Sequence, residues 1–542
     1  MKLRKLIAGA EVARNRGDLD VGISDLAYDS RKAGPGTLFF CVPGEKADGH
    51  GFAEAVVEAG AVGLVVEREL DIDVAQVVVA DSRAAMAPLA ARFWRDPTRE
   101  LRVVGVTGTN GKTTTAFLVR EILEAAGIQC GLLGTVRQVV GGVEEEVERT
   151  TPEAIDLQAT FRRMLDAGDR ACAMEVSSHA LALHRCDAIR FEVALFTNLT
   201  QDHLDFHGSM EDYFQSKRLL FETPRRGVEL GAHGPVSGPP VAIVNVDDPY
   251  GLRLAGEFDC LTFSVEDAEA DFTARDIHLD ASGASFVVVI SAADPEARYT
   301  GGRAGKAGAP RGSDKEGNPG SAEGMADATQ ITVRTELPGH FNVANALGAI
   351  AAATALGVEP EVAATGLAQA SAPPGRFEPV DEGQEFAVVV DYAHTPDSLE
   401  NVLRAARRLT GGRLIAVFGA GGDRDRDKRP KMGRAAAELA DLAIVTSDNP
   451  RSEDPGAIVA EILTGTEGGA EVEVEPDRRA AIALALGRAE PGDTVVIAGK
   501  GHEQGQELEN GRKVPFDDRE VARVELRRLL EDEHPPAAAR EQ

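Results

Sequence analysis

The chain is 542 residues long, 43% of its residues are hydrophobic, and its formal net charge is -30 at pH 7. This length is too great for one hydrophobic core, so we expect about three or four domains. The negative charge argues against nucleic acid as a partner, because such binding needs a basic face. No apolar run approaches the roughly 18 residues that span a bilayer, and the five cysteines are scattered without metal or disulfide spacing. We therefore expect a cytoplasmic protein that does not contact a membrane, and we separately expect a monomer.

The first 97 residues predict a small α/β domain. The segment DSRKAGPGTLFFCVPG (29–44) places a turn before a strand, and FAEAVVEAGAVGLVVE (52–67) predicts a helix followed by another strand. A helix over about 83–95 leads to Asp96-Pro97, where the proline-containing break predicts a linker.

Residues 98–334 predict a central domain in which strands and helices alternate. The apolar run LRVVGV (101–106) suits a strand buried on both faces, and apolar residues at helical spacing follow it. The runs RACAMEVSS, VALFTNL and VAIVNVDD continue the alternation, so we expect a mostly parallel sheet covered by helices. The stretch 293–330 lacks large apolar residues and predicts a flexible insertion between two strands.

Residues 335–542 predict a third α/β domain. Within 335–357 a Pro-Gly turn precedes an alanine-rich helix. Four apolar strands then end in the polar segments DYAHTPDS, GAGGDRDRDKRP, TSDNPRSEDP and GKGHEQG. Because ligands bind beyond the carboxyl ends of strands in open parallel sheets, we expect these four loops to form one site.

The segment GTNGKTT (108–114) lies between the first predicted strand and helix of the central domain. It is a shortened form of the phosphate-binding loop, since Gly108 stands only three positions before Gly111. Backbone N–H groups from Gly108 to Lys112, with the helix N-terminus, would bind an anion. Lys112 adds a charge toward the terminal phosphates and Thr113 a hydroxyl for Mg²⁺, so the segment predicts nucleotide binding.

Four polar residues farther along the chain each allow an interpretation without a functional role. Glu175 follows an apolar strand, where a carboxylate is costly to bury without a cation such as Mg²⁺, but it could also be solvated at the strand end. His203 and His207 have a spacing that zinc sites use, although a capped helix start explains the segment too. By itself, Lys217 predicts an exposed lysine on a helix.

Taken together, these segments resemble the Mur ligases, ATP-dependent amide-forming enzymes of peptidoglycan precursor synthesis. The resemblance implies a domain for the UDP end of a substrate (1–97), a central ATPase domain (98–334) and a Rossmann-like domain that binds an amino acid (335–542). The matching segments run in order along nearly the whole chain: DSRKAGPGTLFFCVPG, GTNGKTT, TTPEA, EVSSHAL, TNLTQDHLDFHG, GHFNVANALGA, GRFE, DYAHTPDS, GGDRDRDKRP, DNPRSEDP and GKGHE.

The resemblance implies roles in ATP and Mg²⁺ binding. Lys217 aligns with a lysine that family members carbamylate, which converts a cation into an anionic oxygen ligand. Thr113 and Glu175 would hold one Mg²⁺, and His203 with the modified Lys217 would hold a second. Together with Lys112, the residues Glu175, His203 and Lys217 are the expected catalytic set. The expected ATP contacts are Gly108, Thr109, Asn110, Gly111, Lys112, Thr113, Thr114, Asn345, Arg376 and Asp391.

The resemblance also implies contacts to the nucleotide-sugar substrate, UDP-N-acetylmuramoyl-L-alanyl-D-glutamate. Leu183 stands where some members have glutamine, and Arg149 where some have asparagine. These departures affect individual contacts to the pyrophosphate or sugar and leave the substrate class unchanged. The expected contacts are Ser30, Glu45, Lys46, Ala47, Thr150, Thr151, Ser177 and Arg185.

The incoming amino acid is expected to be selected by DNPR (448–451), which in the family goes with meso-2,6-diaminopimelate. Arg451 could bind the second carboxylate of this compound through a bidentate fork, although the sequence alone also allows an exposed arginine beside a helix. L-Lysine or another diamino acid is the alternative, and it would leave Arg451 facing no anion. The expected contacts are Arg424, Asp448, Asn449, Pro450, Arg451, Gly499 and Glu503.

The implied reaction proceeds through an acyl phosphate that a free amine displaces. Three other interpretations compete with it: a relative such as MurF or folylpolyglutamate synthase, a P-loop NTPase that uses hydrolysis as a switch, and an inactive binding protein. DNPR and GKGHE argue against the first. The second predicts ATP hydrolysis without any amino acid, and the complete expected catalytic set argues against the third.

Overall fold

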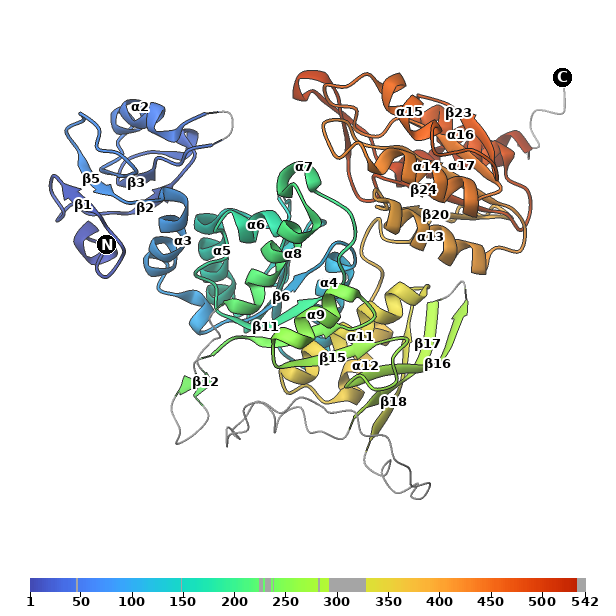
Figure 1. The fold of residues 1–542 in the computed structure, drawn as a ribbon, viewed down its shortest axis with the longest axis horizontal. Coiled ribbons are helices and arrows are strands. Elements are labelled where there is room, and N and C mark those ends of the chain that lie inside the picture. The colour runs from blue at the N-terminus through green and yellow to red at the C-terminus, as the bar shows by residue number, and fades with distance from the viewer. Residues whose placement is uncertain are drawn as a thin grey trace.

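The computed structural model describes residues 1–44, 47–147, 149–223, 228–229, 235–236, 238–280, 283–291 and 328–533. Its elements form three units, which Figure 1 shows in a row from blue to red. Two predictions fall outside the described residues: residues 293–327 of the expected insertion, and the expected substrate contacts Glu45 and Lys46. Within the described part of the chain, no helix combines the length and the apolar composition needed to cross a membrane.

The N-terminal unit contains a five-stranded sheet in the order β1-β5-β4-β3-β2, parallel apart from β1. Helix α3 packs against α5 of the central unit, so the two units share a core. The elements are α1 (Leu3–Leu6), β1 (Arg14–Arg16), β2 (Asp25–Ala27), β3 (Thr37–Phe40), α2 (Ala53–Glu58), β4 (Gly63–Val66), β5 (Ala75–Val78) and α3 (Ser82–Phe93).

The central unit is an eleven-stranded sheet in the order β18-β17-β16-β15-β14-β11-β6-β10-β7-β8-β9. The strands from β16 to β7 are parallel, and the antiparallel pairs lie at the two edges. Its strands are β6 (Arg102–Thr107), β7 (Cys130–Leu133), β8 (Gln138–Val140), β9 (Val143–Glu145), β10 (Ala171–Glu175), β11 (Phe191–Phe196), β14 (Val241–Asn245), β15 (Cys260–Ser264), β16 (Phe272–Asp280), β17 (Gly283–Ile290) and β18 (Thr329–Thr335), with a separate pair β12 (Val228–Glu229) and β13 (Pro235–Val236).

Two helices that follow β18 belong to the central unit by their packing. Helices α11 and α12 contact α4, and their buried alanines lie in the same hydrophobic core as the central sheet. The boundary expected at residue 335 therefore precedes two helices that pack on this sheet. The helices of the unit are α4 (Lys112–Ala125), α5 (Ala154–Ala167), α6 (Ser178–Ala182), α7 (Leu204–His207), α8 (Met210–Arg218), α9 (Pro249–Glu257), α11 (His340–Ala355) and α12 (Pro360–Gln369).

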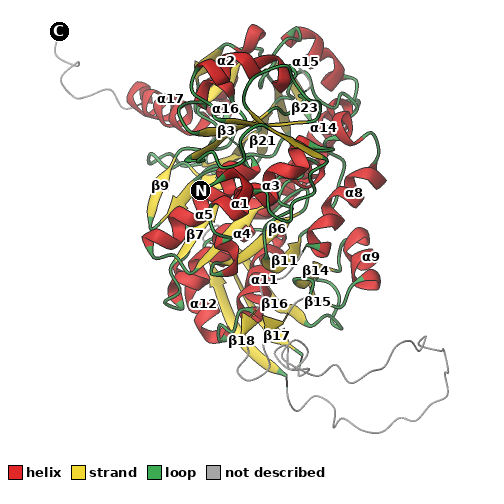
Figure 2. Ribbon diagram, turned by 90° about the vertical axis from the view of Figure 1, so that its left-hand side faces the viewer, coloured by secondary structure: helices red, strands yellow, loops and turns green. Residues whose placement is uncertain are grey.

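The C-terminal unit is a six-stranded sheet in the order β19-β20-β24-β21-β22-β23, parallel apart from β19. Hydrophobic cores lie on both of its faces, and Figure 2 shows helices packed around its strands. The elements are β19 (Glu378–Pro379), β20 (Ala387–Asp391), α13 (Pro396–Leu409), β21 (Leu414–Phe418), α14 (Lys428–Leu439), β22 (Leu442–Val445), α15 (Pro455–Leu463), β23 (Glu471–Val474), α16 (Arg478–Arg488), β24 (Thr494–Ala498), β25 (Gly505–Glu507), β26 (Lys513–Pro515) and α17 (Asp518–Glu533).

The predicted α/β class, with mostly parallel sheets in three units, is confirmed. The four apolar runs predicted in the third unit form β20, β21, β22 and β24, which are adjacent and parallel. Their carboxyl ends therefore lie at one edge of the sheet, where the polar loops begin.

A fully buried ion pair ties α16 to α17 behind this edge. Arg478 Nε and Nη2 donate to the two carboxylate oxygens of Asp518 at 2.8 and 2.6 Å, and Nη2 also donates to the carbonyl of Ala498. We expect Arg478→Ala to lower the free energy of unfolding by about 3–5 kcal/mol, because it leaves a buried carboxylate without its cation. Thermal and denaturant unfolding measure the change.

The neighbouring Arg479 is the matched control, since its half-exposed side chain pairs with Glu525 at the surface. Arg479→Ala should change stability by less than about 1 kcal/mol. Equal losses in the two variants would contradict the role given to the buried pair.

Candidate active site

Two glycines shape the loop between β6 and α4. Gly111 has a φ of 85°, and a Cβ there would collide with Asn345 Oδ1. A Cβ on Gly108 would collide with Thr197 Oγ1. Glycine is therefore needed at both positions to bring the N-terminus of α4 to the carboxyl edge of the sheet.

The structure shows which loop groups can bind an anion. The amides of Thr109 and Asn110 donate to the backbone and side-chain oxygens of Asn198, so they are already used. The first amides of α4 have no acceptor within the helix and supply the anion donors instead. Lys112 Nζ meanwhile donates to the carbonyls of Gly108 and Thr109 at 2.9 and 2.7 Å.

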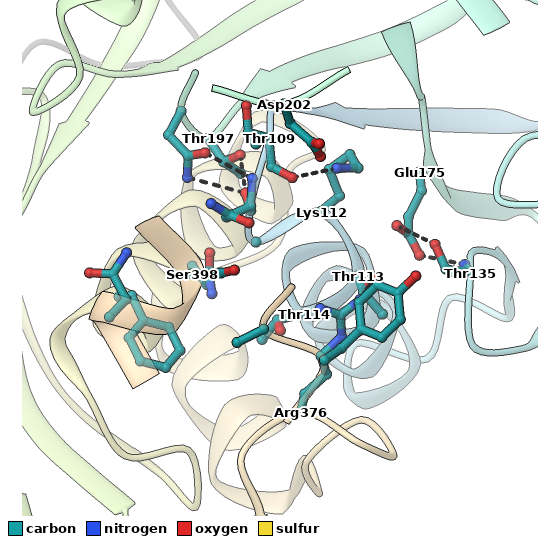
Figure 3. Close-up of a pocket in the computed structure, with 18 of the residues that line it drawn as sticks. Thr109, Lys112, Thr113, Thr114, Thr135, Glu175, Thr197, Asp202, Arg376 and Ser398 are labelled. Atoms are coloured by element: carbon teal, nitrogen blue, oxygen red, sulfur yellow. Dashed lines mark hydrogen bonds between the residues drawn. The ribbon is translucent and has the colours of Figure 1, made fainter. Parts of the chain in front are cut away.

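The loop borders a cavity of about 340 Å³ that lies between the central and C-terminal units (Figure 3). The structure thus brings residues 109–114 together with the distant Asn345, Arg376 and Asp391. Gly108 is not among the described residues that line the cavity, and its carbonyl accepts from Lys112 Nζ. Other lining residues are Thr135, Thr150, Glu175, Ser177, Asp202, His203, Lys217, Tyr392, His394 and Ser398.

Hydrogen bonds connect the two units across this cavity. Arg376 Nη2 donates to Thr113 Oγ1 at 3.0 Å, and Asn110 Nδ2 donates to Asp397 Oδ2 at 2.7 Å. The Arg376 guanidinium lies 4.6 Å from the Tyr392 ring centre, and its Nε is buried without a hydrogen-bond partner among the described residues. A buried donor that lacks an acceptor fits a phosphate-bearing ligand in this cavity.

Glu175 is buried at the end of β10 with an exposed fraction of 1%. Its Oε1 accepts from the Thr135 amide at 2.6 Å and its Oε2 from the Thr135 hydroxyl at 3.0 Å. The interpretation of a solvated residue at the strand end is therefore wrong. A carboxylate has about four acceptor positions, so lone pairs remain for a cation.

Lys217 is also 1% exposed, so the interpretation as a surface lysine is wrong. Helix α8 directs its Nζ to the Gly108 carbonyl at 2.7 Å and over the Tyr213 ring at 4.5 Å. Burial, reinforced by the charge of Lys112, lowers the pKa of Lys217 well below its usual value. A lowered pKa increases the neutral fraction of an amine, and the neutral form reacts with carbon dioxide whereas the ammonium form does not.

His203 and His207 contact different partners. His203 lies before α7 with a φ of 54° and its Nε2 is 3.4 Å from Asp202 Oδ2, while His207 Nε2 bonds to Ser178 Oγ at 2.9 Å. Burial lowers the pKa of His203 to about 3. Among the described residues no group of three or more His, Cys, Asp or Glu side chains is arranged to hold a metal ion. A sparse set of oxygen donors fits Mg²⁺, which keeps waters and binds substrate phosphates.

A second polar cluster lies at the carboxyl edge of the C-terminal sheet. Lys500, fully buried, donates to Asn449 Oδ1 and Glu503 Oε2, both at 2.9 Å, and Asn449 Nδ2 donates to the same Glu503 oxygen. Burial alone would raise the pKa of Asp448, but the charges of Lys500 and Arg478 hold it below its usual value. Lys500 was not among the expected contacts, although it stands inside the GKGHE segment.

Arg451 lies beside this cluster in a left-handed backbone conformation. Its Nε donates to Glu507 Oε2 at 3.0 Å and its Nη1 to the Gly422 carbonyl at 2.8 Å. A Cβ on Gly421 would lie 3.0 Å from Arg451 Nη1 and 3.8 Å from Arg424 Cγ, so the two arginines flank this glycine. The acidic partner Glu507 was not predicted, because nothing in its own sequence segment marks it.

Arg451 borders a second cavity of about 880 Å³, which also spans the two units. Its lining includes Asn449, Glu503 and Glu507 from the C-terminal unit and Thr135 from the central unit. Thr135 lines both cavities, so the cavity of the phosphate loop and the cavity of Arg451 meet at this residue.

The expected nucleotide-sugar contacts divide between two units. In the central unit, Thr151 Oγ1 donates to the Glu175 carbonyl and accepts from the Ser177 amide, and Arg185 Nη1 donates to the Thr151 carbonyl. Ser30 and Ala47 lie in the N-terminal unit and are not among the described residues that line the first cavity. The segment around Ser30 is nevertheless held to α5, because the Tyr28 hydroxyl donates to Asp156 at 2.7 Å.

Three guanidinium groups meet on one buried carboxylate next to these contacts. Glu153 accepts from Arg149 at 2.8 Å, and its oxygens lie 2.9 and 3.3 Å from Arg185 and Arg83. Arg149, the departure from asparagine, thus adds a cation to a cluster with more positive than negative charge. Such a cluster favours an anionic ligand.

A phosphate loop on the central sheet faces a Rossmann-like unit with its own polar cluster, which is the arrangement expected of a multidomain ATP-dependent ligase. Three family profiles match the chain: "Mur ligase family, catalytic domain" over residues 22–99, "Mur ligase middle domain" over 106–353 and "Mur ligase, glutamate ligase domain" over 375–501. The chain therefore belongs to the Mur ligase family.

Curated relatives match almost over their full length. A protein of Syntrophomonas wolfei named UDP-N-acetylmuramoyl-L-alanyl-D-glutamate--2,6-diaminopimelate ligase is 42% identical, over 97% of this chain and 99% of its own. A protein of the same name from Streptomyces coelicolor is 45% identical over 93% of both chains.

Solved structures agree with these matches. A structure of a ligase of that name is 30% identical with a TM-score of 0.62, covering 98% of this chain and 99% of that one. A MurF ligase from Thermotoga maritima, solved in complex with ADP, is 18% identical with a TM-score of 0.59 over 95% and 98% of the two chains, which shows the shared fold.

We expect Gly111→Ala to abolish ADP binding, measured by calorimetry, because the added methyl group collides with Asn345 and strains a φ of 85°. Gly127→Ala is the matched control at the other end of α4: its φ is 73°, but no atom lies within 4 Å of the added methyl group. Gly127→Ala should lose some stability and keep its ADP affinity. Normal binding by the Gly111 variant would contradict the loop geometry.

Proposed function

We propose that this chain catalyses the ATP-dependent ligation of meso-2,6-diaminopimelate to the D-glutamyl γ-carboxylate of UDP-N-acetylmuramoyl-L-alanyl-D-glutamate. One observation carries the proposal: the cavity of the phosphate loop and the cavity of Arg451 adjoin at Thr135. An activated carboxyl group formed in the first would therefore face an amine held in the second. The names of the curated relatives support this choice of substrates.

In this proposal ATP lies on the first turn of α4, with Lys112 toward its terminal phosphates and Arg376 reaching over from the C-terminal unit. Bound Mg²⁺ would neutralise phosphate charge and make the γ-phosphorus more electrophilic. Thr113 and Glu175 would hold one ion, and His203 with carbamylated Lys217 a second. The unmodified Lys217 offers no anionic oxygen to a cation, so the carbamate is part of the proposal.

The first step transfers the γ-phosphoryl group to the substrate carboxylate. A carboxylate oxygen attacks phosphorus, the bond to the β,γ-bridging oxygen breaks, and ADP leaves. Lys112 and the α4 amides, which are fixed before the reaction, stabilise the charge on the transferred group. Glu175 and Lys217 are buried, and water must also be kept from the acyl phosphate, which it would otherwise hydrolyse.

The second step forms the amide. The neutral amine of diaminopimelate attacks the acyl carbon, phosphate leaves with its bridging oxygen, and the amine loses a proton. The carboxylates of Asp448 and Glu503 are suited to hold the amine, and Arg451 and Arg424 to hold the distal carboxylate. L-Lysine has no distal carboxylate, so this pair of arginines argues against the lysine alternative.

Domain roles, location and assembly also belong to the proposal. We assign the UDP end of the substrate to residues 1–97, ATP to the central unit that begins at residue 98, and diaminopimelate to the C-terminal unit. Arg83, Arg149 and Arg185, which surround Glu153, would lie beside the expected path of the substrate diphosphate. We further propose a cytoplasmic monomer, as all expected contacts come from one chain.

An omission assay tests the function. Phosphate release should require ATP, the UDP-dipeptide and diaminopimelate together, and mass spectrometry should find the UDP-tripeptide. A panel containing L-lysine should show preference for diaminopimelate. Phosphate release that proceeds without an amino acid would instead support the NTPase switch, and product from L-lysine alone would overturn the assigned specificity.

We expect Arg451→Ala to raise the KM for diaminopimelate about tenfold to a hundredfold, because a charged hydrogen-bond donor to the distal carboxylate is lost. The KM for ATP should stay unchanged. Arg512→Ala, an exposed arginine on the loop between β25 and β26, serves as the control and should alter neither constant. Equal changes in both KM values of the Arg451 variant would count against the assignment.

We expect Lys217→Ala to lower kcat about a hundredfold, and short carboxylic acids such as acetate to restore part of it by replacing the carbamate. Lys217→Arg keeps a long basic side chain but cannot form the same carbamate, so it should be equally inactive and should not respond to acetate. An active Lys217→Arg enzyme would refute the carbamate.

A further inference from the structure

Thr135 stands at the junction of the two cavities and was not among the residues expected from the sequence. It follows β7, and its neighbours in the chain run along the second cavity. Figure 3 shows it facing Glu175, with both hydrogen bonds drawn between them. The role of its hydroxyl follows from the hydrogen bonds that this group makes.

The backbone around Thr135 wraps closely around Glu175. A Cβ on Gly134 would lie only 2.5 Å from Glu175 Oε1, so this glycine lets the turn approach the carboxylate. The Thr135 amide then holds Oε1 and its hydroxyl holds Oε2. Both oxygens of Glu175 are fixed by one residue, which sets the plane of the carboxylate.

The same hydroxyl has a second partner. Thr135 Oγ1 lies 3.0 Å from Thr150 Oγ1, so a chain of hydrogen bonds runs from Thr150 through Thr135 to Glu175. A hydroxyl has one proton to donate and two lone pairs to accept with. The order of donors along this chain can therefore be worked out.

An ionised carboxylate can only accept hydrogen bonds, so Thr135 must donate its proton to Glu175. At the contact between the two threonines, Thr150 is then the donor and Thr135 the acceptor. Having used its proton, Thr150 retains only lone pairs toward the cavity. A substrate group that binds to the Thr150 hydroxyl must itself be a donor, which excludes a carboxylate or phosphate oxygen at this atom.

We propose that Thr135 is a positioning residue that orients Glu175 and, through Thr150, selects an amide N–H of the substrate peptide at the meeting point of the two cavities. The inference rests on the proposed function, because it takes Glu175 as an ionised cation ligand and the peptide end of the substrate as the group beside it. Thr150 lines the phosphate cavity, where this peptide end must reach to be phosphorylated.

Thr135→Val removes the hydroxyl and keeps the shape and the backbone amide, and Thr135→Ser restores the hydroxyl. In calorimetric titrations of ADP, we expect the valine variant to need about tenfold more Mg²⁺ for half-maximal binding, as for lost partners of metal ligands. Its KM for the UDP-dipeptide should rise while that for diaminopimelate does not, and the serine variant should match the wild type. A valine variant with lower Tm but unchanged Mg²⁺ dependence and KM would reduce Thr135 to a structural residue and overturn the proposal.

The proton order is tested with UDP-dipeptide analogues N-methylated at either peptide amide. The wild type should bind one of them about tenfold more weakly than the parent compound, and Thr150→Val should no longer distinguish the two. Equal binding of both analogues and the parent by the wild type would overturn the donor assignment. The wild-type ligation assay distinguishes failure of this inference from failure of the proposed function. If the wild type is active and Thr135→Val behaves like it, only the role given to Thr135 is refuted.

Discussion

The site depends on the contact between the carboxyl edges of two parallel sheets. The central sheet presents the phosphate loop, and the C-terminal sheet presents Arg376, Asp391 and the DNPR segment. The hydrogen bonds from Arg376 to Thr113 and from Asn110 to Asp397 join these edges. The C-terminal unit contains the expected amino-acid contacts but only Arg376 and Asp391 of the expected ATP contacts, so a complete site requires that the two units meet.

Burial gives this space its chemistry. Glu175 and Lys217 are nearly inaccessible to water, and in a medium of low polarity each charge or dipole has a larger effect. Burial depresses the pKa of Lys217 and thereby makes its modification chemically reasonable. In the C-terminal unit, by contrast, cations and carboxylates are already paired: Lys500 with Glu503, and Arg451 with Glu507. A ligand that carries both charges would have to offer new partners to these groups in order to bind there.

The sequence predicted the fold well because its signals are local. Apolar runs such as LRVVGV and the glycines of GTNGKTT determine strand, turn and helix from neighbouring residues, and β6 and α4 follow them. Packing between distant segments could not be predicted in this way. The alanine-rich α11 belongs to the central core, the amides of Thr109 and Asn110 are taken by Asn198, and Lys217 is buried, all through contacts far apart in the chain. Thr135, Lys500 and Glu507 were missed for the same reason, since each acquires its meaning from a partner on another element.

The central claim is that the substrate carboxylate is phosphorylated before the amide forms, and an isotope experiment tests it directly. The D-glutamyl γ-carboxylate would be labelled with ¹⁸O in both oxygens and the substrate incubated with the enzyme, ATP and diaminopimelate. Our account predicts that one labelled oxygen leaves in the released phosphate and the other stays in the new amide. Unlabelled phosphate accompanied by a normal yield of the tripeptide would contradict the acyl phosphate.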